Sequence, residues 1–218
     1  MKILSESRSG SQGGQTFSRN RFGQYVRNRA VPVNPRSVNQ QAVRARLSNN
    51  AAAWRALTDS QRAAWTGLGY MILRTDSLGQ SYNLTGFQSY VMVNNNRLAA
   101  GDAIVSTPPS LTDPGTLLTA TLTLTSSSFS AAYTATPLAS GVRLFIYASP
   151  QTTAGRSFQG DARLIQVSAA AAASPLNVLA AYSARFGAPV TGNKIFVNLV
   201  LYQAGFLGSA LKVAQVVA

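Results

Sequence analysis

The side chains best able to do chemistry in this sequence are carboxylates and guanidinium groups, because the chain contains no His and no Cys. A Ser–His–Asp triad, thiolate catalysis and thiolate or imidazole metal sites are therefore excluded. The six acidic residues are Glu6, Asp59, Asp76, Asp102, Asp113 and Asp161. No two of them are close neighbours in the sequence. We expect no catalytic, cofactor or metal site, and the alternatives left open are a carboxylate-only glycosidase and a Ca²⁺ site whose acids meet in space.

Arginine is the charged residue type that is concentrated in one part of the sequence. The formal charge is +13, and residues 1–104 hold thirteen basic and four acidic side chains. No acid occurs between Glu6 and Asp59, an interval that contains nine Arg residues. Guanidinium groups pair with carboxylate or phosphate and stack on aromatic rings. The interval therefore predicts contact with an acidic protein surface or with DNA, against the alternative of an ordinary solvated face.

The candidate partner-binding residues of this interval are Arg19, Arg21, Phe22, Tyr25, Arg27, Arg29, Arg36, Arg44 and Arg46. No helix-turn-helix, zinc finger or other nucleic-acid module is recognisable around them, which favours a protein partner over DNA.

The elements that would present these residues begin with a hairpin. Two polar runs at 16–19 and 24–27 flank Gly23, and Tyr25, Arg27 and Arg29 fall on one side of the second run. The preceding Ser/Gly/Gln-rich residues 1–15 predict a flexible arm. Prolines at 32 and 35 end the extended segment, so we expect a helix to start near Arg36 or Ser37.

Three helices are expected in the remainder of the N-terminal half. Thr58 and Gln61 form a capping-box pattern that predicts a second helix from 59 to about 68. Trp54, Leu57 and Trp65 are expected to clamp the first two helices together as core residues. Residues 74–83 are predicted to be a loop with a turn at Gly79, and a third helix is predicted from 87 to about 100.

The C-terminal half changes character after a Pro-rich segment. Leu or Ala alternates with Thr over 118–125, which is the period-two pattern of a half-buried strand. Further strands are expected over 129–136, 142–149, 163–170, 194–203 and 210–217. Such regular short strands predict an antiparallel β-sandwich that is immunoglobulin-like or fibronectin type III-like. Residues 172–187 fit either one more strand or a short helix.

The sequence thus predicts an α+β fold in four parts. These are a flexible arm (1–15), a basic hairpin plus helical anchoring domain (16–104), a linker (105–116) and an immunoglobulin-like β-sandwich (117–218). We expect no signal peptide, since no apolar stretch follows the first four residues, and no membrane contact, since no run of about 18 apolar residues occurs.

Five motifs carry a resemblance to a protein type. They are SRNRFGQYVR (18–27), PVNP (32–35), QQAVR (40–44), WRALTDSQRAAW (54–65) and LTGFQSY (84–90). Over about residues 15–110 the chain resembles small proteins encoded near the structural genes of tailed phages and prophages. The C-terminal half is similar to the immunoglobulin-like domains of phage heads and tails. The resemblance implies a virion-associated structural role for a protein that is made in the host cytoplasm.

Three functions are compatible with these observations. The first is a capsid- or tail-attached structural protein that contacts other proteins of the same virion, as a homo-oligomer or symmetric array, with the basic region as its anchor. The second is a DNA-binding or packaging-associated protein, which would bind DNA in a salt-sensitive way. The third is a host-surface adhesin that binds glycan through Tyr147, Tyr182 or Tyr202, for which a core or interface position is the expected alternative.

Overall fold

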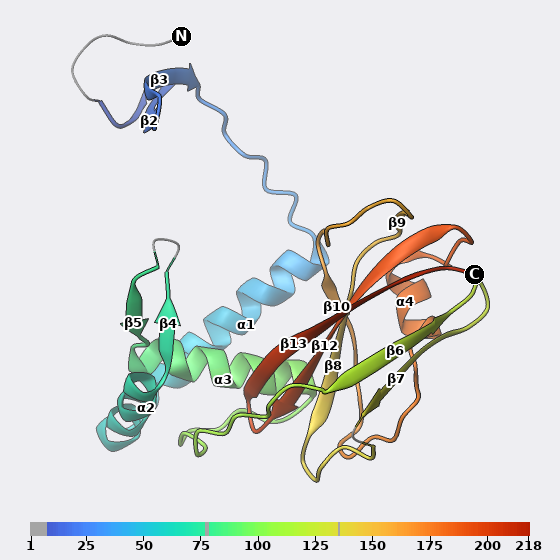
Figure 1. Ribbon diagram of the computed structural model, residues 1–218. Helices are drawn as coiled ribbons and strands as arrows, with labels where there is room; N and C mark the ends of the chain where they lie inside the picture. The colour runs from blue at the N-terminus through green and yellow to red at the C-terminus, as the bar shows by residue number, and fades with distance from the viewer. Residues whose placement is uncertain (1–7, 77–78, 135) are drawn as a thin grey trace. The chain divides into compact units, whose positions relative to one another are not determined.

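A computed structural model of the chain describes residues 8–76, 79–134 and 136–218 (Figure 1). The fold is α+β, with four helices among the described residues and antiparallel sheets. The chain divides into two compact units, Met1–Arg44 and Ala45–Ala218, here called the N-terminal unit and the main unit. Helix α1 (Val38–Arg55) contains the boundary between them.

The N-terminal unit is built on a three-stranded sheet of β1 (Gly10–Gln12), β2 (Gln15–Asn20) and β3 (Gly23–Asn28). The predicted hairpin is confirmed, with Phe17 opposite Val26 in the register. Its turn forms because the Asn20 side chain accepts a hydrogen bond from the Phe22 backbone N–H at 2.9 Å, and because Gly23 takes a φ of 111°. Strand β1 lies within the predicted arm, whose residues 1–7 are outside the described part of the chain.

The sheet leads to α1 through residues 29–37, here called the tether. The tether has no regular secondary structure, and Val33 within it is 89% exposed. Helix α1 begins at Val38, one residue after the predicted start. The start is fixed because Ser37 Oγ accepts from the Gln40 N–H at 3.4 Å and Gln40 Oε1 accepts from the Ser37 N–H at 3.3 Å.

The helices α2 (Asp59–Met71) and α3 (Gly86–Ala100) both start with capping boxes, Thr58 with Gln61 and Thr85 with Gln88. Each box satisfies two backbone N–H groups that a helix start leaves unpaired. The two helices pack closely, since a Cβ atom on Gly86 would lie 2.5 Å from Thr66 Oγ1 of α2. Gly101, with a φ of 80°, ends α3 as expected.

The predicted aromatic core of the helices is confirmed. Trp65 is fully buried, and its ring meets that of Tyr90 at 5.1 Å between centroids. Trp54 packs against the same Tyr90 ring at 5.4 Å, and Leu57 belongs to the same cluster. Trp65 Nε1 also donates to the Ser106 carbonyl at 2.8 Å, so the chain leaving α3 is fixed to α2.

The prediction of a plain loop over 74–83 is wrong. Residues Leu73–Thr75 (β4) and Ser81–Asn83 (β5) form a two-stranded hairpin, with Gly79 at a φ of 82° in its turn. Three-residue strands are too short to show a period of two, which is why the pattern missed them. Residues 77–78 of the predicted loop are outside the described part.

The C-terminal half of the main unit contains two antiparallel sheets. The larger comprises β10 (Arg163–Val167), β8 (Arg143–Ala148), β12 (Asn193–Gln203), β13 (Phe206–Val216) and β9 (Thr152–Thr153), which pairs with β12. The smaller comprises β11 (Leu176–Asn177), β7 (Phe129–Thr134) and β6 (Thr119–Leu124). The six predicted strands are confirmed in place, with bounds shifted by up to four residues. Residue 135, in the predicted strand 129–136, lies outside the described residues.

The region 172–187 combines both predicted alternatives. Strand β11 pairs with β7, and α4 (Leu179–Phe186) follows it directly. Tyr182 of α4 is fully buried and packs edge-on against Phe129 of β7 at 5.3 Å between ring centroids. The short helix therefore closes one end of the core between the sheets.

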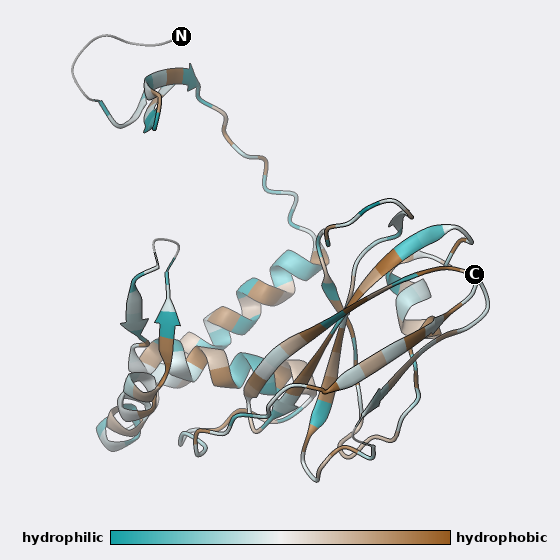
Figure 2. Ribbon diagram, viewed as in Figure 1, coloured by the Kyte–Doolittle hydropathy of each residue, from teal (hydrophilic) through white to brown (hydrophobic). Residues whose placement is uncertain are grey.

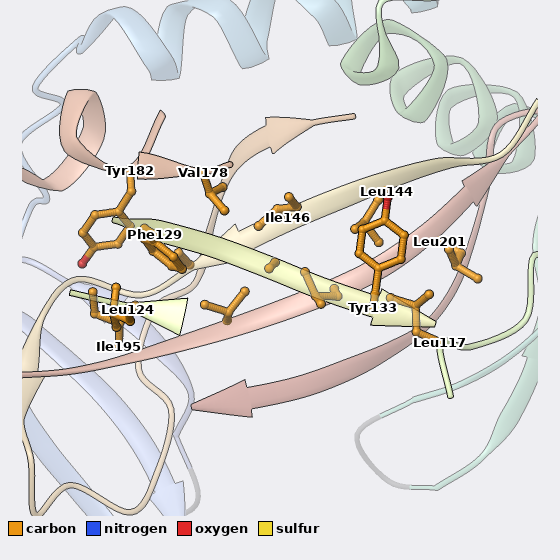
Figure 3. Packing of buried hydrophobic residues seen from close by; sticks show 14 of the residues in the cluster. Leu117, Leu124, Phe129, Tyr133, Leu144, Ile146, Val178, Tyr182, Ile195 and Leu201 are labelled. Carbon is orange, nitrogen blue, oxygen red and sulfur yellow. The ribbon is translucent and has the colours of Figure 1, made fainter. Parts of the chain in front are cut away.

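The central strands of the larger sheet, β8 and β12, are buried on both faces. Leu144, Ile146 and Ala148 of β8 share one core with Phe129 and Tyr133 of the smaller sheet (Figure 3). Phe145, between them, belongs instead to a second cluster with Tyr202 and with Ala100 of α3. Burial on two faces explains why β8 reads as a continuous apolar run, without alternation. Figure 2 shows long hydrophobic stretches along these strands and mixed colouring on the N-terminal sheet.

Candidate partner-binding surface

The face of the N-terminal sheet that carries Tyr25 and Arg27 is the first part of the candidate surface. In the register these residues lie opposite Ser18 and Thr16, so all four side chains are on one face. Arg29 continues the pattern, because its N–H donates to the Gly14 carbonyl at 2.8 Å just beyond the strand. The predicted aromatic–arginine face is therefore confirmed, with Tyr25 half-buried and both Arg side chains exposed.

The hairpin turn adds the second part. The Arg21 guanidinium lies over the Phe22 ring, 4.6 Å from its centroid, and the ring itself is 65% exposed. A cation over an aromatic face stabilises a surface pair by about 0.5–1 kcal/mol. Arg19 is exposed at the end of β2. The turn thus presents a rigid aromatic–guanidinium pair to solvent.

The remaining predicted residues lie on the tether and α1. Arg44 Nη2 and the Arg36 backbone N–H both reach Asn34 Oδ1, each at 3.3 Å. That shared acceptor holds the end of the tether close to the first turns of the helix. Arg46 is exposed on α1, two residues beyond Arg44 and within the main unit. Six of the predicted arginines lie in the N-terminal unit, and we call them the basic surface: Arg19, Arg21, Arg27, Arg29, Arg36 and Arg44.

The charge of the basic surface is uncompensated within the described residues. The two ion pairs found there join Arg62 to Asp59 at 3.1 Å and Arg143 to Asp102 at 2.9 Å. Neither involves the basic surface. The N-terminal unit has eight basic residues and one acid, a net +7, and the main unit has eleven and five, a net +6. Both units therefore repel cations and attract anionic partners.

The N-terminal unit has no buried core. None of its described side chains, from residue 8 to 44, is buried, and even the Phe17–Val26 pair is only half-buried. A sheet this small needs a packed face to be stable by itself. The unit is therefore an element whose apolar side chains are available to a partner.

Two carboxylates of the main unit, Asp102 and Asp113, hold parts of the chain together. Asp102 accepts from Tyr202 Oη at 2.6 Å and pairs with Arg143, whose other nitrogen donates to the Ala100 carbonyl. Burial, together with the hydrogen bond to Asp102, raises the pKa of Tyr202 above its ordinary range. Asp113 accepts from the Gly115 N–H at 2.9 Å. Within the described ranges, no three acidic side chains group as metal ligands.

The tyrosines considered for glycan binding are core residues. Tyr182 and Tyr202 are buried, which confirms the alternative expected for them, and Tyr147 packs partly buried against the same cluster as Tyr202. Tyr182 Oη donates to the Ser149 carbonyl at 3.2 Å, and burial raises its pKa to about 12. These rings form no exposed platform for a sugar.

A cleft of about 540 Å³ in the main unit was not foreseen from the sequence. Arg74 of β4, Met92 and Asn96 of α3, Asp113, and Phe206 of β13 contribute to its walls. Its lining comes from four separate stretches of the chain, so no local motif could have indicated it. Asn96 Nδ2 donates to the Gly205 carbonyl at 2.9 Å, which fixes one wall.

Comparison with known protein families, curated proteins and solved structures finds no match to this chain. No helix of the described residues is both long and apolar enough to cross a bilayer. The candidate surface therefore rests on the residues and contacts given above.

Proposed function

We propose that this protein is a structural component of a tailed-phage virion that attaches to capsid or tail proteins through its basic N-terminal region. The observation that carries the proposal is the N-terminal unit, which exposes six guanidinium groups that form no ion pair with the described residues and buries none of its described side chains. An element of that kind gains its packing only on a partner. The motifs at 18–27 and 54–65, which resemble those of phage structural proteins, support the same function.

The strand-rich half would stabilise or decorate the particle. Its two antiparallel sheets share one core, and we propose that they form an immunoglobulin-like sandwich of the kind seen on phage heads and tails. Only 11% of the chain is charged, so its surfaces can meet neighbouring subunits with little desolvation of charge. A symmetric array of copies on the particle is the arrangement that this composition favours.

The proposal is tested by attachment to particles. Arg19, Arg21, Arg27 and Arg29 are replaced together by Gln in the phage or prophage that encodes the chain, and the protein bound to density-purified particles is quantified. The matched control replaces Arg55, Arg163, Arg185 and Lys212, which are exposed on the main unit, and lowers the net charge equally. Four exposed ion pairs of about 0.2–1 kcal/mol each sum to about 0.8–4 kcal/mol, so the first variant should attach at least about fourfold more weakly.

The control variant should stay on the particles at the level of the unmodified chain. Equal loss from both variants would show that attachment depends on total charge and not on the N-terminal unit. Absence of the unmodified chain from purified particles would overturn the proposed function itself.

A further inference from the structure

The N-terminal unit exposes large apolar side chains as well as arginines. Val31, Val33, Val38 and Val43 are 75%, 89%, 82% and 61% exposed, and Val33 and Val38 are the two most exposed large apolar residues of the described chain. The six arginines of the basic surface come from the same unit. Protein interfaces combine an apolar centre with Arg, whereas nucleic-acid interfaces are more polar and more uniformly cationic. The combination on this unit favours a protein partner.

The tether is preorganised for such a partner. Pro32 and Pro35 fix their backbone φ and lack N–H groups, so residues 31–35 are extended and cannot form a continuous strand ladder, and Arg36 then turns the chain with a φ of 46° (Figure 1). Val31 and Val33 flank Pro32, and both of their side chains are exposed. An extended segment of this kind docks through its side chains into a groove, and its ordering costs little on binding.

A second copy of this chain does not have the complementary charge. The main unit carries a net +6, and its acids are partly engaged, Asp102 by Arg143 and Asp59 by Arg62. Pairing the basic surface with another main unit would bring like charges together. The partner of the tether must therefore be an acidic protein other than this chain.

We propose that the tether and the first turns of α1 dock into an apolar groove of an acidic protein. Val31, Val33, Val38 and Val43 enter the groove, and carboxylates on its rim pair with Arg29, Arg36 and Arg44. Burial of the valines slows dissociation of the complex, and the arginines speed association and select the orientation of the partner. This inference rests on the proposed attachment function and names the chemistry of the surface to which the chain attaches.

The test uses the full-length protein and three fluorescent polyanions of similar length, namely duplex DNA, poly-glutamate and a Glu–Tyr copolymer. Binding is followed by anisotropy from 50 to 500 mM salt. Binding through phosphate or carboxylate alone should fall by more than about a thousandfold over this range, because several counterions are released per complex. The copolymer offers apolar rings beside its carboxylates. Its affinity for the protein should therefore fall far less over this salt range than the affinity of poly-glutamate does.

Two variants complete the test. Replacing Val31 and Val33 by Ser should weaken copolymer binding at 500 mM salt by about a hundredfold, roughly tenfold for each valine removed from an apolar contact. It should leave DNA binding at 50 mM salt unchanged. The matched control, Leu118→Ser with Val190→Ser, removes exposed apolar side chains of the main unit. It should change neither copolymer binding at 500 mM salt nor DNA binding at 50 mM salt.

The inference is overturned if the copolymer dissociates with salt as steeply as poly-glutamate, if the valine variant behaves like its control, or if duplex DNA is the tightest probe at 500 mM salt. The last result would identify a nucleic acid as the partner. Because these measurements use no particles, absence of the chain from virions would overturn the proposed function while leaving this result unaffected.

Discussion

Replacing Asp102 by Asn should measurably destabilise the main unit. Asp102 follows Gly101, the residue that caps α3, and its carboxylate accepts from Arg143 of β8 at 2.9 Å and from Tyr202 of β12 at 2.6 Å. Arg143 also donates to the Ala100 carbonyl at the end of the same helix. One carboxylate thus holds the end of α3 on two neighbouring strands of the larger sheet.

The size of the effect follows from these contacts. Hydrogen bonds to charged groups contribute about 1.5–3 kcal/mol each. Asn keeps one acceptor oxygen but loses the charge, and it turns an N–H₂ group toward either Arg143 or Tyr202. The side chains of the ion pair are 28% and 25% exposed, which places the loss at the lower end, about 2 kcal/mol. For a chain of this size the melting temperature should fall by about 4–8 °C.

The assay is urea unfolding followed by tryptophan fluorescence, because Trp54 and Trp65 both lie in the helical cluster of the main unit. Asp161→Asn, at an exposed position, is the control and should change the free energy of unfolding by less than about 0.5 kcal/mol. Tyr202→Phe combined with Asp102→Asn should cost less than the sum of the two single changes. The reasoning fails if Asp102→Asn matches its control, or if the two changes add fully.

Three further predictions concern stability. Thr58→Ala and Thr85→Ala should each lower the free energy of unfolding by about 1 kcal/mol, measured by urea unfolding, because each removes a capping box. A serine at either position should restore most of the loss. Gly208→Ala should cost about 1–3 kcal/mol, since the added Cβ would overlap the Gly115 carbonyl oxygen; unchanged stability would contradict that packing. Burial raises the pKa of Tyr182 from 10.0 to about 12, so the unfolded chain loses this proton first as pH rises. Its contribution to stability is complete below pH 10 and should decline between pH 10 and 12, and Tyr182→Phe should flatten the decline measured in urea.

Local sequence signals predicted the elements that depend on neighbouring residues. The hairpin followed from two polar runs around Gly23, and the start of α2 followed from Thr58 and Gln61. The strand β6 followed from the Leu–Thr alternation, which the structure shows as alternating burial from Ala120 to Leu124. Each of these signals lies within about ten residues, so it needs no knowledge of the tertiary fold.

Features made by distant residues were not predictable in this way. Asp102 meets a tyrosine one hundred positions away, and no local pattern marks either residue as a partner of the other. The β4–β5 hairpin was not predicted because its strands have three residues each. The sequence did not decide between a strand and a helix for α4, because only eight residues form it. The walls of the cleft near Met92 likewise come together only in the folded main unit.

The candidate surface was predicted in part. The absence of acids from residue 7 to 58 indicated exposed arginines, and each of the predicted Arg residues is exposed. The exposure of Val31 and Val33 could not be inferred, because valines in an extended run are equally typical of a buried strand. Only the structure, in which nothing of the N-terminal unit covers them, reveals their availability to a partner.

The proposed attachment function is tested most directly by quantitative mass spectrometry of density-purified, nuclease-treated particles, prepared from a strain that expresses this chain from its own locus. If the chain is attached to virion proteins, it should band with the particles at a fixed ratio to a major head or tail protein, and nuclease should not release it. Recovery of the chain only in the particle-free fraction, or its release by nuclease, would show that it is not attached to virion proteins.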